Sequence, residues 1–384
     1  MMQSEKPKSG GTSKILNSSQ VYITMFVSQA LLMLTMNTVY SSGARMQDFL
    51  ISVGIAFFLN ILLMLPTALL LRMYPGKSIL EISRELMGRY AAVVYGIYLL
   101  YYTVMSSYYL SFFELFLANV LDPKISLLMV TISVMGVSAY SAWRGLEAVV
   151  RVAELVAVIL ILGFVFLLSA LFPKVESVEF LPFFENSFSS YMTGALLLFS
   201  RSGALSMVGI LIPHTKGKKV GGFLLYNFTF YVIFSLILIA CVGTMGGYLD
   251  HWLFPVYSAS AFAQTGILQS MDALFVAMWI CGLMTKLSMD LSLSSLCCRH
   301  ISPRVKKWPI LPVAAVSGAV SLMICYNKTM QNLFFSLQLL LPVLLLTLGA
   351  IPVLLLILHF CRKKQTEKGG KTDAELHIPQ PSVE

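Results

Sequence analysis

Charged residues are scarce in this sequence: Asp, Glu, Lys and Arg make up only 12% of its 384 residues, whereas 57% are hydrophobic. Such a composition is typical of a chain that lies mostly within a lipid bilayer. Any chemistry must then come from the few polar groups that lie within apolar segments.

The sequence also lacks the usual signatures of enzymes and metal sites. Its six cysteines are scattered through apolar segments and their ends, so they predict packing residues rather than a disulfide framework. No cluster of His, Cys, Asp and Glu has metal-ligand spacing. There is no P-loop, Gly-x-Ser-x-Gly or His-Glu-x-x-His motif. We therefore expect no enzyme activity, no cofactor and no metal.

Long apolar stretches are abundant. A bilayer core about 30 Å thick requires roughly 20 apolar residues per helix. Ten stretches meet this length, approximately at residues 18–42, 46–71, 90–118, 125–142, 148–172, 189–212, 220–248, 266–298, 309–326 and 330–360. The sequence therefore predicts an all-α polytopic membrane protein with ten transmembrane helices.

The flanking segments are polar, and no short apolar region with a cleavage site suggests a signal peptide. We expect a cytoplasmic head at 1–17, one membrane domain at 18–360 and a disordered cytoplasmic tail at 361–384.

Basic residues alternate between the two sides of these stretches. With a cytoplasmic N-terminus, 21 of the 27 Lys and Arg residues lie on the inner side and 4 on the outer side. Because positive charge is retained on the cytoplasmic side, this bias predicts ten spans with both termini inside. These inner loops also account for the net charge of +9, which therefore requires no nucleic-acid partner. Contact of the loops with anionic lipid is natural.

Ionisable residues within the spans are functional candidates, because each costs about 2.5–3.5 kcal/mol at the bilayer centre on insertion scales. Lys286 and Asp290 lie four residues apart in the eighth span, on one helix face. Lys286 can replace a coupling ion or line a cavity; a structural ion pair or a lysine that extends to the membrane surface is the alternative.

Arg151 and Glu154 share a face of the fifth span near the cytoplasm, which suggests either an inner gate or an interfacial ion pair. Glu114 and Asp272 lie near helix ends, where ordinary solvation explains them.

Arg201 lies centrally in the sixth span, among Ser200, Ser202, Gly203, Ser206 and Gly209. Small polar residues of this kind can interrupt a transmembrane helix and line a cavity. Close helix packing, with Arg201 paired to a carboxylate such as Glu114, is the alternative.

The third span is rich in tyrosine, and five of its aromatic residues have spacings close to one helix face: Tyr95, Tyr98, Tyr102, Tyr109 and Phe113. This face can line a ligand pocket or form ordinary core packing with phenolic hydrogen bonds.

Three segments resemble spore-germinant receptor B subunits. Gly145, Arg151 and Glu154 match a Gly-x-x-x-x-x-Arg-x-x-Glu pattern within residues 138–154. Residues 271–288, with Asp272, Trp279 and Lys286, resemble the eighth span of that family, and residues 74–81 resemble the loop after its second span.

This resemblance implies membership of the amino acid/polyamine/organocation permeases and a LeuT-like fold. In that fold two inverted five-helix repeats surround a central site, and helices one and six are broken there. The sequence departs from the pattern at residues 30–36, which lack the usual Gly-rich, Pro-terminated break, and at Leu205, where Glu is expected.

We therefore expect a nutrient-sensing B subunit that binds an amino-acid-type ligand, works with A and C subunits and lies in the spore inner membrane. An autonomous proton-coupled amino acid permease is the alternative. The expected ligand-binding residues are Thr35, Asn37, Thr38, Tyr102, Phe199, Ser202, Gly203 and Lys286. The expected gating or structural ion-pair residues are Arg151, Glu154, Arg201, Lys286 and Asp290.

Overall fold

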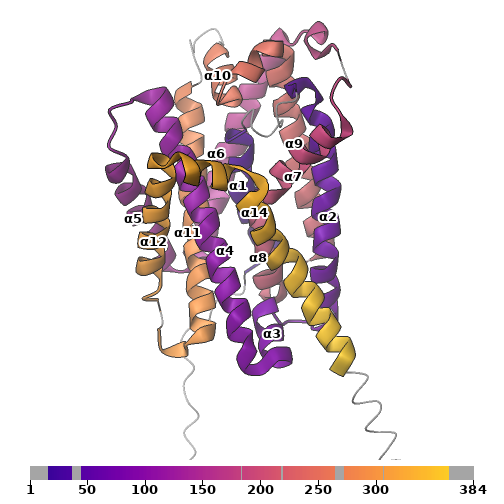
Figure 1. The fold of residues 1–384 in the computed structure, drawn as a ribbon, viewed down its shortest axis with the longest axis vertical. Helices are drawn as coiled ribbons and strands as arrows, with labels where there is room; N and C mark the ends of the chain where they lie inside the picture. The colour runs from indigo at the N-terminus through magenta and orange to yellow at the C-terminus, as the bar shows by residue number, and fades with distance from the viewer. Residues whose placement is uncertain are drawn as a thin grey trace, which may run out of the picture.

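The computed structural model describes residues 16–36, 45–182, 184–217, 219–263, 272–305 and 307–362. These residues form helices and no β-strand, apart from one isolated bridge between Asn17 and Lys216. The helices run side by side in a bundle whose two ends are marked by α3 and α10 (Figure 1).

The long helices follow the predicted spans closely. They are α1 (Ser18–Leu34), α2 (Phe49–Met73), α4 (Ala91–Phe116), α5 (Leu127–Arg144), α6 (Leu146–Leu171), α7 (Phe188–Ser200), α9 (Val220–Met245), α11 (Asp272–Ile301) and α12 (Ile310–Tyr326). Shorter helices are α3 (Ile79–Met87), α8 (Ser206–Ile210), α10 (Pro255–Phe262), α13 (Lys328–Phe335) and α14 (Leu337–Leu344).

Short 3₁₀ and π segments continue or connect these helices. The 3₁₀ segments are η2 (Met46–Asp48), η3 (Gly88–Tyr90), η5 (Phe172–Lys174), η6 (Ser177–Phe180), η7 (Gly203–Leu205), η8 (Ile212–His214), η9 (Gly246–His251) and η10 (Pro303–Val305). The π segments are η4 (Leu117–Leu121) and η11 (Leu345–Ala350).

The chain is an integral membrane protein. Within the described residues, seven helices are long and apolar enough to cross a membrane, or nine if each of two bent helix pairs is one span. The 17-residue helix α1 is apolar but shorter. The exact count of ten stays a prediction, and it requires α1 as the tenth span.

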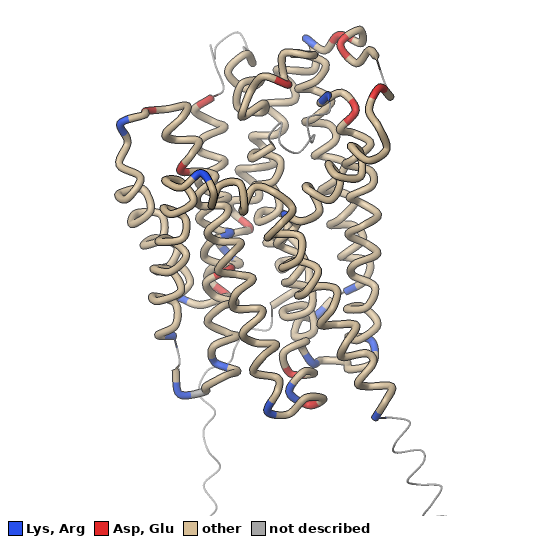
Figure 2. Tube along the Cα trace, viewed as in Figure 1, with Lys and Arg blue, Asp and Glu red and all other residues tan. Residues whose placement is uncertain are grey.

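Charge is distributed unevenly along the bundle. Lys and Arg positions gather toward the α3 end (Figure 2). The loop at the opposite end carries Glu176, Glu179 and Glu185. This agrees with the predicted placement of the α3 end in the cytoplasm, and the orientation itself stays a prediction.

Helix α11 lies at the centre of the bundle and packs against α1, α4, α5 and α6. Small residues permit this close packing. A Cβ atom at Gly282 of α11 would lie 3.2 Å from Leu31 Cδ2 of α1, and one at Gly163 of α6 would overlap the Met278 side chain of α11. The polar residues of α11 are thereby held in the interior.

One boundary differs from the sequence prediction. The last span, Leu337–Arg362, begins at Leu337 rather than at residue 330, because α13 is a separate helix that is bent by 110° from α12. Asn327 and Ser336 have extended backbones, and each side chain accepts a hydrogen bond from a following backbone N–H. Such caps start new helices inside an apolar run.

Helix α3 was not among the predicted elements. The Ser78 side chain accepts a hydrogen bond from the Glu81 backbone N–H, while the Glu81 carboxylate accepts one from the Ser78 backbone N–H. This is a capping box, whose Ser-x-x-Glu signature is visible in the sequence.

Candidate functional site

The sixth span is interrupted, as its sequence predicts. Helix α7 ends at Ser200, and the axis turns by 48° before η7 and α8 continue. At the interruption the Gly203 N–H donates to the Arg201 carbonyl over 2.7 Å, and Ser202 has φ −73° and ψ 54°. These values describe an inverse γ-turn. The turn replaces part of the regular helical hydrogen bonding, so its carbonyl groups depend on partners from other helices.

Tyrosines of the third span supply those partners. The Tyr109 hydroxyl donates to the Arg201 carbonyl over 2.8 Å, and the Tyr101 hydroxyl donates to the Gly203 carbonyl over 3.0 Å. Both side chains are buried. Helix α4 therefore holds the interruption at both ends of the turn.

The predicted tyrosine face does not act as a unit. Tyr98 donates to the Thr347 carbonyl and Tyr95 to the Leu80 carbonyl. The Tyr102 hydroxyl is buried and makes no hydrogen bond to the described part of the chain. Tyr101, which the predicted face leaves out, is one of the two residues that bind the turn.

Lys286 lies directly against the interruption. Its Nζ is 2.8 Å from Asp290 Oδ1, and both side chains are fully buried. A Cβ atom at Gly203 would lie 3.1 Å from this Nζ. Ser106 Oγ of α4 donates to Asp290 Oδ2 over 3.3 Å, and Nζ lies 5.6 Å from the centre of the Tyr109 ring. The eighth span thus places an ion pair with no formal net charge beside the turn of the sixth.

The first span contributes a residue that the sequence reasoning passed over. The Gln29 Nε2 group of α1 donates to Ser202 Oγ over 3.1 Å, while Gln29 Oε1 is buried with no partner in the described residues. A polar residue in the middle of an apolar span is itself a signal for such a role.

Thr35 follows directly after α1. Its hydroxyl is buried and makes no hydrogen bond within the described residues. Asn37 and Thr38 lie outside those residues. From Ser18 to Leu34 helix α1 is uninterrupted.

The Arg201 side chain binds several groups. Nε donates to the Tyr108 hydroxyl over 2.7 Å, Nη1 to the Leu197 carbonyl over 2.6 Å, and Nη2 to the Phe335 carbonyl over 2.6 Å. The last bond links the sixth span to the end of α13.

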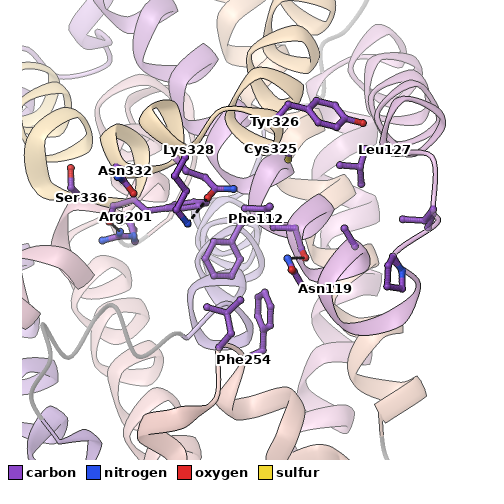
Figure 3. A pocket seen from close by; sticks show the side chains of 17 residues that line it. Phe112, Asn119, Leu127, Arg201, Phe254, Cys325, Tyr326, Lys328, Asn332 and Ser336 are labelled. Atoms are coloured by element: carbon purple, nitrogen blue, oxygen red, sulfur yellow. Dashed lines mark hydrogen bonds between the residues drawn. The ribbon is translucent and has the colours of Figure 1, made fainter.

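Arg201 also lines a cavity of about 820 Å³ that lies beside α13. Figure 3 shows Arg201 near Lys328, Asn332 and Ser336, with Phe112 and Phe254 nearby. We call this cavity the vestibule. It is lined by Phe112, Leu115, Ala118, Asn119, Pro123, Ile125, Leu127, Arg201, Leu253, Phe254, Cys325, Tyr326, Lys328, Gln331, Asn332, Phe335 and Ser336.

Two other groups of ionisable residues are arranged differently from the sequence prediction. Arg151 does not pair with Glu154: its Nη2 lies 2.5 Å from Glu147 Oε1, one turn earlier on an exposed face. Glu114 is fully buried, contrary to the helix-end solvation expected for it. Its carboxylate accepts hydrogen bonds from the Thr131 and Ser321 hydroxyls and from the Cys325 thiol.

The central cluster is tightly packed. Ser202, Gly203, Phe199, Lys286 and Tyr102 are all buried, so a ligand can enter only if neighbouring helices move. Backbone groups of an interrupted helix and a buried ion pair can exchange partners with a zwitterion. No group of three metal-ligating side chains occurs in the described ranges.

Comparisons with known proteins agree with this architecture. A family model described as spore germination protein matches residues 15–333. The chain is similar in structure to a Na⁺-coupled sialic acid symporter in a substrate-bound, outward-open state. The TM-score is 0.59 at 12% identity, covering 87% of this chain and 79% of the other. The fold is therefore LeuT-like. A comparison with curated proteins found no match.

Proposed function

Because the chain belongs to the spore germination protein family, we propose that it is the nutrient-sensing B subunit of a spore-germinant receptor. In this proposal an amino-acid-type ligand binds at the interruption of the sixth span, beside Lys286. The receptor lies in the spore inner membrane with both termini of this chain in the cytoplasm, and A and C subunits transmit its response.

The observation that carries this proposal is the way in which the interruption is held. Two tyrosines of α4 bind its carbonyl groups, and Gln29 of α1, which is continuous from Ser18 to Leu34, binds Ser202. Alternating access requires half-helices that bend independently, whereas a sensor needs only a small shift between two conformers. Such a shift is limited by the ligand's differential affinity for the two conformers.

The buried ion pair adds a second argument. The Lys286 ammonium group provides a fixed cation beside the turn, where a transporter of this fold would bind a mobile coupling ion. A fixed cation allows ligand binding without an ion gradient, which suits a receptor in a dormant membrane.

The apolar outer helices are suited to partner subunits or lipid. Helix α6 exposes a row of large apolar side chains, namely Val152, Leu155, Val158, Leu162, Val165 and Phe166. In the proposed receptor, the A and C subunits pack against surfaces of this kind.

One feature favours the alternative, a proton-coupled permease. Glu114 is buried in the third span and is held by two hydroxyls and a thiol, which makes it a candidate to bind and release a proton.

Germination assays distinguish the two functions. In a spore-forming host that expresses this chain with its neighbouring receptor subunits, Lys286→Ala should abolish germination by one nutrient class while membrane levels stay normal. Lys124→Ala, which removes a lysine from an exposed loop, is the matched control. If purified protein alone catalysed proton-driven amino acid uptake into liposomes, and its deletion left germination intact, the permease would replace the receptor.

A further inference from the structure

The vestibule has a distinctive charge pattern. Its wall contains two cations, Arg201 and Lys328, and none of its lining residues is acidic. Amide and hydroxyl side chains extend the polar wall, from Asn119, Asn332 and Ser336. A cavity with this lining favours an anion over a neutral or cationic molecule.

Another part of the lining is aromatic. The ring centre of Phe112 lies 5.5 Å from that of Phe254 and 5.5 Å from that of Phe335. Apolar walls with a few polar groups at one side are typical of small-molecule sites, and about 820 Å³ lies within their usual size range.

Helix α13 lies beside the vestibule, between two residues with extended backbones. Asn327 precedes it with φ −120° and ψ 112°, and Ser336 follows it with φ −87° and ψ 178°. Phe334 is its only buried residue, and Met330, Leu333 and Phe335 are partly buried against the core. A short helix that has few buried side chains and is flanked by extended residues can move as a unit.

Arg201 binds the end of this helix. Its Nη2 donates over 2.6 Å to the carbonyl of Phe335, the last residue of α13. A carboxylate is a stronger acceptor for a guanidinium group than a neutral carbonyl is. A carboxylate in the vestibule would therefore compete with Phe335 for this hydrogen bond.

We propose that the vestibule is a binding site for a small molecule that bears a carboxylate, held between Arg201 and Lys328, and that its binding releases the end of α13. This cavity shares Arg201 with the interruption of the sixth span, but its lining does not include Lys286. The proposal does not depend on the receptor function, because it applies equally to a sensor or a permease.

The test uses the purified full chain in detergent and two probes of the same shape. Succinate carries two carboxylates, and succinamide has neutral amides in their place. Calorimetric titration should detect succinate binding, with succinamide at least about tenfold weaker. The vestibule-lining variant Asn332→Cys provides a second readout. Succinate should change the maleimide labelling rate at residue 332 by at least about twofold, as followed by peptide mass spectrometry.

Charge variants locate the site. Lys328 is exposed and its side chain contacts Gln331, so Lys328→Glu should leave the fold intact while weakening succinate binding by about tenfold or more. Gln331→Glu, which adds an acid to the wall, should act in the same direction. Lys124→Glu makes the same charge change between Pro123 and Ile125, which line the cavity, but Lys124 is itself exposed and not a lining residue. It should therefore have a several-fold smaller effect.

Three results would each overturn the proposal. The first is no succinate binding, and the second is equal binding of succinate and succinamide. The third is equal weakening by Lys328→Glu and Lys124→Glu, which would show that succinate responds to overall charge rather than to this cavity.

Discussion

The ammonium group of Lys286 and the backbone of Gly203 are in direct contact across the interface of the eighth and sixth spans. A methyl group at Gly203 would lie 3.1 Å from Nζ, and Nζ is already held by Asp290. Gly203→Ala should therefore destabilise the protein by about 1–3 kcal/mol, as overpacking of a buried site does.

The measurement is the thermal unfolding midpoint in detergent. Gly136→Ala in α5 is the matched control, because a Cβ atom there has no neighbour within 4 Å. It should be neutral or stabilising by up to about 1 kcal/mol. Equal effects of the two substitutions would show that Gly203 makes no special contact.

A second prediction concerns the buried ion pair. Lys286→Met leaves the Asp290 carboxylate buried beside a neutral side chain, and should cost about 3–5 kcal/mol. Adding Asp290→Asn removes the isolated charge and should restore a large part of the loss. Unfolding of both single variants and the double variant measures the coupling. If the loss of stability in the double variant equals the sum of the losses in the two single variants, Lys286 and Asp290 do not form a direct pair.

A third prediction concerns the tyrosines of α4. Tyr109→Phe removes the hydrogen bond to the Arg201 carbonyl and should lower stability by about 0.5–1.5 kcal/mol. Ligand binding should change more than stability does, because the turn then loses one of its two hydrogen bonds from the tyrosines of α4. Tyr140→Phe, at a side chain that is 65% exposed, is the control and should alter neither property.

A fourth prediction concerns topology. A cysteine at Val178 should react with an impermeant reagent added outside, and a cysteine at Lys216 should not. Gly217 is less suitable as the inner position, because its φ is +117° and a Cβ atom would lie 2.5 Å from Ser18 Oγ. The reverse labelling pattern would invert the predicted orientation.

Much of the fold could be predicted from the sequence because lipid imposes strong rules. Apolar length located the spans, and the run of Ser, Arg and Gly at 200–203 located the interruption of the sixth span. These signals are reliable because a backbone within a bilayer can satisfy its hydrogen bonds in only a few kinds of structure.

The ion-pair and hydrogen-bond partners of individual side chains could not be predicted from the sequence. Arg151 has Glu147 one turn before it and Glu154 one turn after it, and spacing alone does not select between them. Helix α4 is buried on nearly every side, so hydrophobic periodicity does not distinguish Tyr101 from Tyr102. The start of the last span at Leu337 depends on the cap at Ser336, which the surrounding apolar run conceals.

The two tyrosine bonds to the turn of the sixth span set a threshold for any response. Each of these hydrogen bonds contributes roughly 0.5–1.5 kcal/mol. To reshape the turn, a bound molecule must therefore compensate for the loss of about 1–3 kcal/mol from the two bonds together. Its affinity for the reshaped state must then exceed that for the resting state by about 5–150-fold before the reshaped state becomes the major one. Molecules with a smaller difference in affinity can bind without producing a response. Binding and response are then distinct properties, and near-analogues of an activating compound become competitive antagonists.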